Sequence, residues 1–267
     1  MSKLPKANQF IDISDYGRPA AKAIAHLLKA TTITPIHVTV AFTISGLLAI
    51  WCIVNGYAWA AAFFLILKSI LDAADGELAR VKETPSYTGR YLDSVADILL
   101  NALLLGTLWF LTDASFLYTL LAFLGMQLQG TIYNYYYVIL RNRFDGDTTS
   151  RIFEKHPPLA MEGEKQQNVN ILFFLYKGLY GIFDKAIYLF DRSAVKSTWF
   201  PNWFMTIVSL LGLGSQLLII SIFLVLGISE FIIPFFIFYT SMIFMIIATR
   251  KIFGRVVSDD TEHQLYS

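Results

Sequence analysis

Hydrophobic residues gather along this chain into six long apolar segments that are separated by short polar connections. The segments cover roughly residues 36–55, 57–80, 89–112, 115–140, 201–226 and 229–249. Each is close to the length of about 20 apolar residues that a helix needs to cross a bilayer. The pattern therefore predicts an all-α integral membrane protein with six transmembrane helices.

Two further stretches are amphipathic. In residues 16–30 one side is apolar and the other carries basic residues, which predicts an N-terminal helix lying in the membrane interface. The apolar side consists of Ala20, Ala23, Ile24, Leu27 and Leu28. Residues 168–190 are rich in Leu, Phe and Tyr but also carry Lys177, Asp184 and Lys185. Because charges are costly in the middle of a bilayer, we expect this segment to be interfacial as well.

The positions of the basic residues predict the orientation. Every Lys and Arg except Lys68 lies in residues 1–35, residues 80–90, the connection 141–200 or the tail from 250 onward. The alternate connections carry none; they are residues 55–58, 112–115 and 226–230. Since basic residues accumulate in cytoplasmic loops, both termini are predicted to be cytoplasmic.

This orientation divides the chain into three parts. We expect a cytoplasmic or interfacial N-terminal segment, a six-helix transmembrane domain and a cytoplasmic tail. These parts are residues 1–35, 36–249 and 250–267, with a cytoplasmic loop and interfacial helix at 142–200.

Composition agrees with a membrane protein. Hydrophobic residues make up 55% of the 267 residues, charged residues make up 15%, and the mean hydropathy is +0.54. A soluble domain carries nearer a quarter of charged residues, so soluble and disordered classes are excluded. The net charge of +1 gives no support for nucleic-acid binding. Cys52 is the single cysteine, which excludes an internal disulfide and a cysteine-based metal cluster.

Four aspartates stand where the second and third segments meet. Asp72 and Asp75 are three residues apart, and Asp93 and Asp97 are four apart, so each pair shares one face of a helix. Pro85 marks the turn between the two helices. At about 1.5 Å rise per residue, Asp72 comes level with Asp97 and Asp75 with Asp93. The sequence thus predicts one carboxylate cluster just inside the cytoplasmic edge of the bilayer.

Such a cluster must be neutralised by protons or by cations. Carboxylate oxygens without histidine or cysteine nearby suit Mg²⁺ or Mn²⁺ rather than zinc. Two such ions could clamp the attacking and leaving oxygens of a phosphoryl displacement. Gly76 and Ala79 leave room for a close approach, and Arg80 offers a fixed cation to a phosphate.

The spacing of these residues resembles the signature of the CDP-alcohol phosphatidyltransferase family. The matching residues are Asp72-x-x-Asp75-Gly76-x-x-Ala79-Arg80, then eight residues, then Gly89-x-x-x-Asp93-x-x-x-Asp97. A second stretch, Thr34-Pro35-Ile36-His37-Val38-Thr39, is similar to the Thr-Pro-Asn-x-x-Thr with which the first span of that family begins. Ile36 stands here in place of the usual Asn.

The resemblance implies an enzyme of phospholipid biosynthesis that works at the cytoplasmic face and forms a homodimer. It would transfer a phosphatidyl group from a CDP-linked lipid, expected to be CDP-diacylglycerol, to the hydroxyl of an alcohol and release CMP. By resemblance, the metal ligands are Asp72, Asp75, Asp93 and Asp97, with Asp97 also the base that takes the hydroxyl proton. The residues expected to contact the CDP moiety are Gly76, Ala79, Arg80 and Gly89.

Two other functions remain open at this point. The same motif would suit a phosphotransferase that uses CDP-choline or CDP-ethanolamine as donor and diacylglycerol as acceptor. A cation transporter could also use the aspartates as its binding site. A transporter would need a polar path to the far side, where the spans carry no second acidic cluster.

Several weaker candidates complete the prediction. Lys68 could tune the aspartate cluster or serve a structural role. The polar residues of the fourth segment could line an acceptor pocket or pack between helices; they are Gln127, Gln129 and Asn134. Basic residues after this segment could bind a phosphorylated acceptor or reflect cytoplasmic location alone; they are Arg141, Arg143, Arg151, Lys155 and Lys165. Gly212 and Gly214 could allow close helix contact, for example between two subunits.

Overall fold

The computed structural model describes residues 4, 9–143, 154 and 156–266, with side chains up to Gly254. Its helices are α1 Arg18–Leu28, α2 Pro35–Val54, α3 Ala58–Val81, α4 Tyr87–Thr112, α5 Phe116–Arg143, α6 Gln166–Phe190, α7 Asn202–Ser209, α8 Leu213–Val225, α9 Ile232–Tyr239 and α10 Met242–Tyr266. Short 3-10 turns occur at η2 Ile13–Asp15, η3 Arg192–Lys196 and η4 Ser229–Phe231. The prediction of an all-α protein is confirmed.

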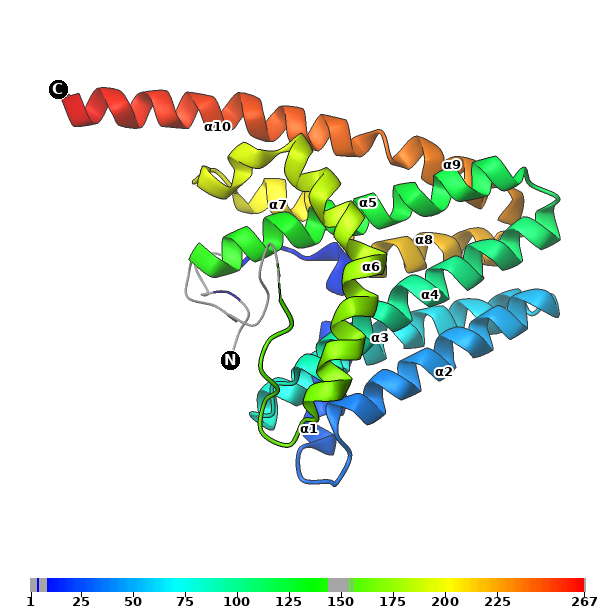
Figure 1. Cartoon of the computed structure of the whole chain (residues 1–267). Helices are drawn as coiled ribbons and strands as arrows, with labels where there is room; N and C mark the ends of the chain where they lie inside the picture. Colours follow the sequence, from blue (N-terminus) through cyan, green and yellow to red (C-terminus); the bar gives the residue numbers. More distant parts are fainter. Residues whose placement is uncertain (1–3, 5–8, 144–153, 155, 267) are drawn as a thin grey trace.

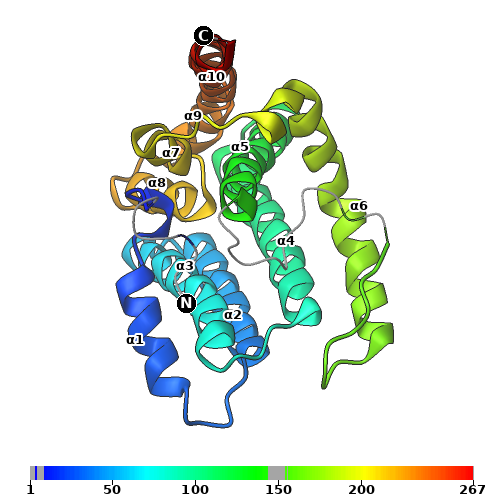
Figure 2. The same cartoon turned by 90° about the vertical axis from the view of Figure 1, so that its left-hand side faces the viewer.

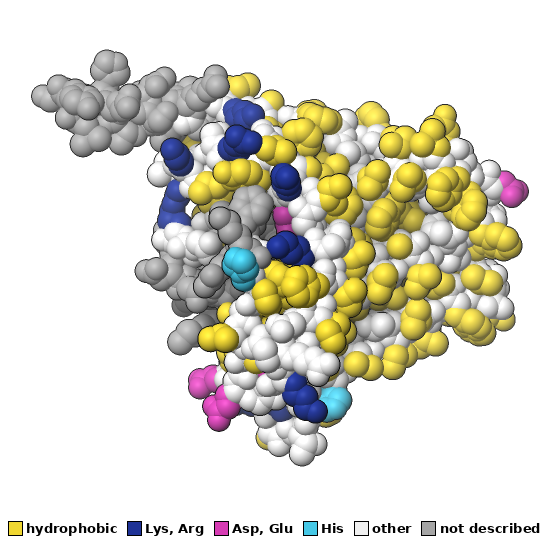
Figure 3. Space-filling view, in the orientation of Figure 1, with side chains coloured by type: hydrophobic (Ala, Val, Ile, Leu, Met, Phe, Trp, Pro, Cys, Tyr) yellow, Lys and Arg dark blue, Asp and Glu magenta, His cyan; other side chains and the backbone are white. Residues whose placement is uncertain are grey.

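Most of the long helices run in one general direction, and two helices cross them. Helices α2, α3, α4, α5 and α8 form the bundle, while α1 and α6 run across its direction near one end (Figures 1 and 2). On the face shown in Figure 3, hydrophobic side chains cover most of the bundle, and Lys and Arg gather at the end that α6 crosses. Hydrophobic and basic side chains are thus separated along the bundle, as expected for a bundle with one polar end.

Within the described residues, three helical segments are long and apolar enough to cross a membrane. They are α2, α4 and Ser229–Gly254, which joins η4, α9 and the start of α10. The bent pair α7 and α8 would make a fourth if it counts as one span. Several long apolar helices therefore indicate a multi-pass membrane protein. Helices α3 and α5 lie in the same bundle but fall outside this set, so the described residues show three or four candidate spans of the six predicted.

The predicted segment 201–226 is not one continuous helix. The chain breaks between α7 and α8, whose axes differ by 48°. Gly212 is extended at the break, and the N–H of Gly214 donates to Ser14 Oγ at 3.0 Å. A Cβ added to Gly214 would overlap the carbonyl oxygen of Ser14. The close contact at these glycines is therefore made by the N-terminal turn η2 of the same chain, and it accounts for them without a second subunit.

Helix α1 forms where the amphipathic pattern predicts it. Ala21 and Ala25 are fully buried and pack against Ala74 and Leu78 of α3. Leu27, on the side predicted to be apolar, is 77% exposed. The small residues thus bring α1 close to the helix that carries Asp72 and Asp75, and a larger apolar side chain remains outside.

Local capping fixes the residues at which α2 and α4 begin. The N–H of Thr34 donates to His37 Nδ1 at 3.0 Å, and Pro35 occupies the first position of α2. Ser86 caps α4, since its Oγ accepts a bond of 2.8 Å from the N–H of Gly89. Glu83, with φ of 56°, reverses the chain between α3 and α4. These turns set the register in which the aspartates of α3 face those of α4.

Candidate active site

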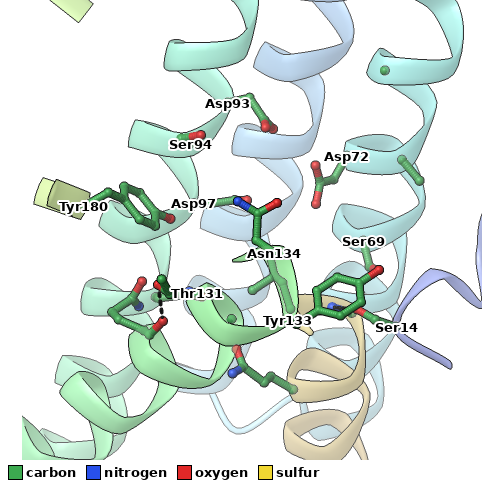
Figure 4. A pocket seen from close by; sticks show the side chains of 18 of the residues that line it. Ser14, Ser69, Asp72, Asp93, Ser94, Asp97, Thr131, Tyr133, Asn134 and Tyr180 are labelled. Atoms are coloured by element: carbon green, nitrogen blue, oxygen red, sulfur yellow. Dashed lines mark hydrogen bonds between the residues drawn. The ribbon is translucent and has the colours of Figure 1, made fainter. Parts of the chain in front are cut away.

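Helices α3 and α4 bring the predicted aspartates together. Asp72 and Asp75 belong to α3, and Asp93 and Asp97 belong to α4. Figure 4 shows Asp72, Asp93 and Asp97 beside one another. One carboxylate oxygen from each of Asp72, Asp75 and Asp93 lies within 4.8 Å of the other two. Asp97 lies one turn further along α4 and is buried. The first three residues could hold a divalent cation through oxygen ligands alone, which fits the chemistry of Mg²⁺ or Mn²⁺.

Lys68 supplies a cation from within the protein. Its side chain is 2% exposed and forms an ion pair with Asp97. Its Nζ also lies 3.9 Å from Asp72 Oδ2 and 4.9 Å from the centre of the Phe42 ring. Lys68 therefore does not extend toward the bilayer surface; it is fixed between the two carboxylates and an aromatic ring.

Thr39 lies next to the aspartate cluster, and the sequence analysis assigned it no role. Its Oγ1 donates to Asp75 Oδ2 at 2.6 Å, and Thr39 is 2% exposed. The signal was present, because Thr39 is the last residue of the second motif. Ile36 of the same motif lies beside Gly89, since a Cβ on Gly89 would be 3.8 Å from Ile36 Cγ1. Helix α2 thus supports both acidic helices.

A cavity of about 380 Å³ opens beside the aspartates. All four aspartates line it, together with Gly76 and Arg80. Ala79 and Gly89 lie nearby on α3 and α4 but outside the lining. A volume of this size lies within the usual range for small-molecule sites.

Arg80 is directed to this cavity by its neighbours on α3. Its Nη2 lies 3.0 Å from Glu77 Oε1, while its Nε has no hydrogen-bond partner among the described residues. A Cβ at Gly76 would lie 3.6 Å from Arg80 Nη1, so glycine leaves the guanidinium accessible along the helix. This arrangement presents a cation next to the carboxylates, as the sequence predicts.

Helix α6 contributes residues that the sequence analysis did not assign to the site. Tyr176, Tyr180 and Asp184 follow one another at intervals of four and line the cavity. The two tyrosine rings stack with centroids 5.5 Å apart, and Tyr176 OH lies 3.3 Å from Asp184 Oδ2. Figure 4 shows Tyr180 pointing toward Asp97. The four-residue spacing was a readable signal, but it does not reveal which helix α6 would face.

The polar residues of α5 separate into two groups. Gln127 and Asn134 line the cavity. Gln129 is fully buried elsewhere, where its Nε2 donates to Phe236 O at 3.3 Å and to Thr240 Oγ1 at 3.0 Å. Gln129 therefore packs helices, and the other two face the site.

The basic residues predicted to bind a phosphorylated acceptor do not line the cavity where the structure describes them. Arg141 is buried and lies 5.2 Å from the centre of the Tyr137 ring, and Arg143 donates to the carbonyl of Ser197. Lys165 precedes α6 and is exposed. Arg151 and Lys155 lie outside the described residues.

Glu164 fastens the segment before α6 to the start of α4. Its Oε1 accepts bonds of 2.7 Å from Ser86 Oγ and from the N–H of Thr88, and its Oε2 accepts one of 3.0 Å from the N–H of Met161. Burial opposes the charged form, but these hydrogen bonds outweigh it and hold the pKa of Glu164 below the ordinary value of 4.5. The contact keeps α6 beside the acidic helix α4.

Residues 31–153 match the family model described as CDP-alcohol phosphatidyltransferase. This part of the chain belongs to the CDP-alcohol phosphatidyltransferase family. The match spans α2 to α5 and includes every residue of the aspartate motif. The match identifies an enzyme of this family over residues 31–153, and the family implies transfer of a substituted phosphate from a CDP donor. A search of curated proteins gave no match.

Proposed function

We propose that this transferase moves a phosphatidyl group from CDP-diacylglycerol to the hydroxyl of an alcohol and releases CMP in phospholipid biosynthesis. The observation that carries the proposal is the meeting of Asp72, Asp75 and Asp93 at the edge of a cavity that also contains Asp97 and Arg80. A CDP-linked donor needs a cationic site for its pyrophosphate, and an alcohol needs a base for its proton. Both requirements are met within one cavity.

Asp72, Asp75 and Asp93 would hold Mg²⁺ or Mn²⁺, and Asp97 is a further candidate ligand if two ions bind. When bound, such a cation neutralises the carboxylates and makes the phosphorus more electrophilic. Thr39 holds one oxygen of Asp75 in place through its hydrogen bond, so the position of that ligand is set before any ion arrives.

Residues of the chain itself bind the donor and accept the proton. Arg80 binds the donor phosphates, and Gly76, Ala79 and Gly89 allow the CDP moiety to approach the helices closely. Asp97 accepts the hydroxyl proton, and the ion pair with Lys68 stabilises its ionised form, which is the form able to accept that proton. The acceptor oxygen then attacks the lipid-side phosphorus, and CMP leaves.

For the membrane we propose six spans, with both termini and the site on the cytoplasmic side. The spans would be α2, α3, α4, α5, the pair α7 and α8, and the segment Ser229–Gly254. The placement of the basic residues supports this orientation. Helices α1 and α6, which run across the bundle, would lie in the interface (Figure 1). A homodimer is proposed from the family resemblance alone.

The test is to incubate purified protein with labelled CDP-diacylglycerol, Mg²⁺ and a panel of alcohols, and to measure CMP release and the lipid product. CDP-choline with diacylglycerol serves as the competing substrate pair. Release of CMP from CDP-choline but not from CDP-diacylglycerol would refute the proposed donor.

Asp97→Asn tests the assigned base. We expect kcat to fall at least about 100-fold, the usual scale for loss of a general base. The fold should persist, because Asp72 remains 3.9 Å from Lys68 as a counter-charge. The matched control is Asp113→Asn, which makes the same chemical change at the exposed far end of α4 and should leave kcat unchanged. Full CMP release by Asp97→Asn would show that another group takes the proton.

A further inference from the structure

The cavity continues from Asp97 into the bundle, and its inner part is lined by uncharged polar groups. Asn101 follows Asp97 by one turn on the same face of α4 and is 4% exposed. Gln127 and Thr131 approach from α5, one turn apart. Thr131 Oγ1 donates to the carbonyl of Gln127 at 2.7 Å, which fixes its hydroxyl in the wall (Figure 4). An alcohol whose reacting hydroxyl lies at Asp97 would extend along these groups.

Gln127 is the residue that points to a ligand. It is 4% exposed, lines the cavity, and its Nε2 has no hydrogen-bond partner among the residues that the structure describes. Gln129, two residues away, has both of its polar atoms bonded. A buried amide N–H without a partner is unfavourable, because it has lost its hydrogen bond to water and has formed no other. The free N–H of Gln127 therefore needs an acceptor atom from a molecule in the cavity.

The charges around the cavity exclude an anionic acceptor from the inner part. Among the described residues, Arg80 is the one Lys or Arg that lines the cavity, and it pairs with Glu77. Asp184 adds a carboxylate to those of the motif, and Asp15, which also lines the cavity, is already paired with Arg18. A phosphate carried into this space would meet acidic groups and find amides as its remaining partners. Phosphates are usually bound by several cations or by convergent N–H groups.

The chemistry of Gln127 also separates hydroxyls from ammonium groups. Its unpartnered Nε2 is a donor, and an ammonium group has donors only, so an ammonium group could bond Gln127 Oε1 but would leave this N–H without an acceptor. A hydroxyl both donates and accepts, so it can take the bond from Gln127 and give one to an amide oxygen or a carbonyl. Several hydroxyls on a small uncharged molecule would satisfy Asn101 and Gln127 together.

The inner end does not suit the acyl chains of the donor. Met126 and Gln216 line it and are each 1% exposed. Gln216 is fixed there, since its Nε2 donates to Met126 O at 3.0 Å and to Gln129 Oε1 at 3.1 Å. Two lipid chains would need an apolar path to the bilayer, whereas Gln216 places a fixed amide in this part of the wall.

We propose that Asn101, Gln127 and Thr131 form the binding site of an uncharged polyol, which is the acceptor alcohol of the reaction. The assignment of this polyol as the acceptor rests on the proposed function. Asp97 takes the proton of one hydroxyl, and Gln127 bonds another, so Gln127 determines specificity without touching the reacting atoms. The preferred acceptor is unphosphorylated and carries no amine.

Acceptor preference is the first measurement. Purified protein with CDP-diacylglycerol and Mg²⁺ is given glycerol or myo-inositol, their monophosphates, and serine or ethanolamine in parallel. We expect kcat/KM to be highest for an uncharged polyol. A higher kcat/KM for a monophosphate or for an amino alcohol would overturn the proposal.

Gln127→Met and the matched Gln129→Met test the residue itself. Gln127→Met should raise KM for the polyol about 3- to 10-fold, the scale of one lost hydrogen bond, and leave KM for the donor unchanged. Its melting temperature should stay the same, because no bond within the protein is lost. Gln129→Met should lower the melting temperature and leave both KM values within about 2-fold. A rise in KM for the donor alone would assign Gln127 to the lipid and refute the acceptor site.

Direct binding keeps this test separate from the proposed reaction. Equilibrium dialysis of radiolabelled myo-inositol and glycerol against wild type and Gln127→Met needs no turnover. Absence of CMP release with every alcohol would refute the proposed function, and dialysis would still decide the polyol site. Equal binding by wild type and Gln127→Met, or no binding of either polyol, would refute the site even if CMP is released.

Discussion

Replacement of Lys68 by Met probes the charge balance of the aspartate cluster. Lys68 is 2% exposed, pairs with Asp97 and lies 3.9 Å from Asp72 Oδ2. Methionine has a similar length and would fit against Phe42, whose ring centre is 4.9 Å from the Lys68 Nζ. The substitution therefore removes a charge and little volume, and Asp97 is left buried without its partner.

The magnitude follows from this burial. Removal of one partner of a buried ion pair costs about 3–5 kcal/mol, because the remaining charge is uncompensated. The low exposure of Lys68 means that solvent screening reduces this figure little. In a chain of this size about 1 kcal/mol lowers the melting temperature by roughly 2–4 °C, so Lys68→Met should lower it by roughly 6–20 °C. Added Mg²⁺ should reduce the difference, since a divalent cation supplies the missing positive charge.

The assay is thermal unfolding in detergent with a chelator present, so that no metal ion compensates for the lost ammonium. The double variant Lys68→Met/Asp97→Asn removes both charges and should melt above Lys68→Met alone. Contacting residues of this kind usually show a coupling of about 0.5–3 kcal/mol. A decrease of less than about 2 °C for Lys68→Met, or strict additivity in the double variant, would show that the pair does not stabilise the site.

Two further predictions concern the metal and the fold. Exhaustive chelation should stop CMP release and added Mg²⁺ or Mn²⁺ should restore it, because Asp72, Asp75 and Asp93 bring three carboxylates together; turnover that survives chelation would contradict the metal role. Gly214→Ala should cost about 1–3 kcal/mol by overpacking, since its Cβ would overlap the carbonyl oxygen of Ser14, and thermal unfolding measures it. Gly178→Ala, where an added Cβ meets nothing within 4 Å, is the control and should not destabilise; equal effects of the two changes would show that the contact with Ser14 is unimportant.

Periodicity and capping signals were sufficient for the helices and for the aspartates. Apolar segments of membrane length and the turn at Pro85 placed α3 and α4 within a few residues of their observed bounds. The three- and four-residue spacings then fixed which faces the aspartates share, because side-chain direction within a helix follows from local geometry. The meeting of Asp72, Asp75 and Asp93 needed only that the two helices form an antiparallel hairpin.

The contribution of α6 could not be predicted in the same way. Tyr180 and Asp184 share a face with Tyr176, but sequence spacing does not say that this face covers the cavity beside α4. The break after α7 also depends on a distant residue, because Ser14 inserts beside Gly214 from the other end of the chain. Contacts between segments so far apart in sequence leave no local periodic signal.

The sequence by itself determined a helical membrane enzyme, the family motif and the acidic hairpin, because these depend on composition and on spacing within one or two helices. The tertiary structure alone decided the partner of each polar residue. Gln127 and Gln129 are the same amino acid two positions apart, and about 100° per residue puts them on nearly opposite sides of α5. Gln129 is hydrogen-bonded to α9, whereas Gln127 Nε2 lies at the cavity without a partner in the part of the chain that the structure describes, and neither outcome follows from a property of the residue itself. Burial of Lys68 against Asp97 is decided in the same way, by the helix on the other side.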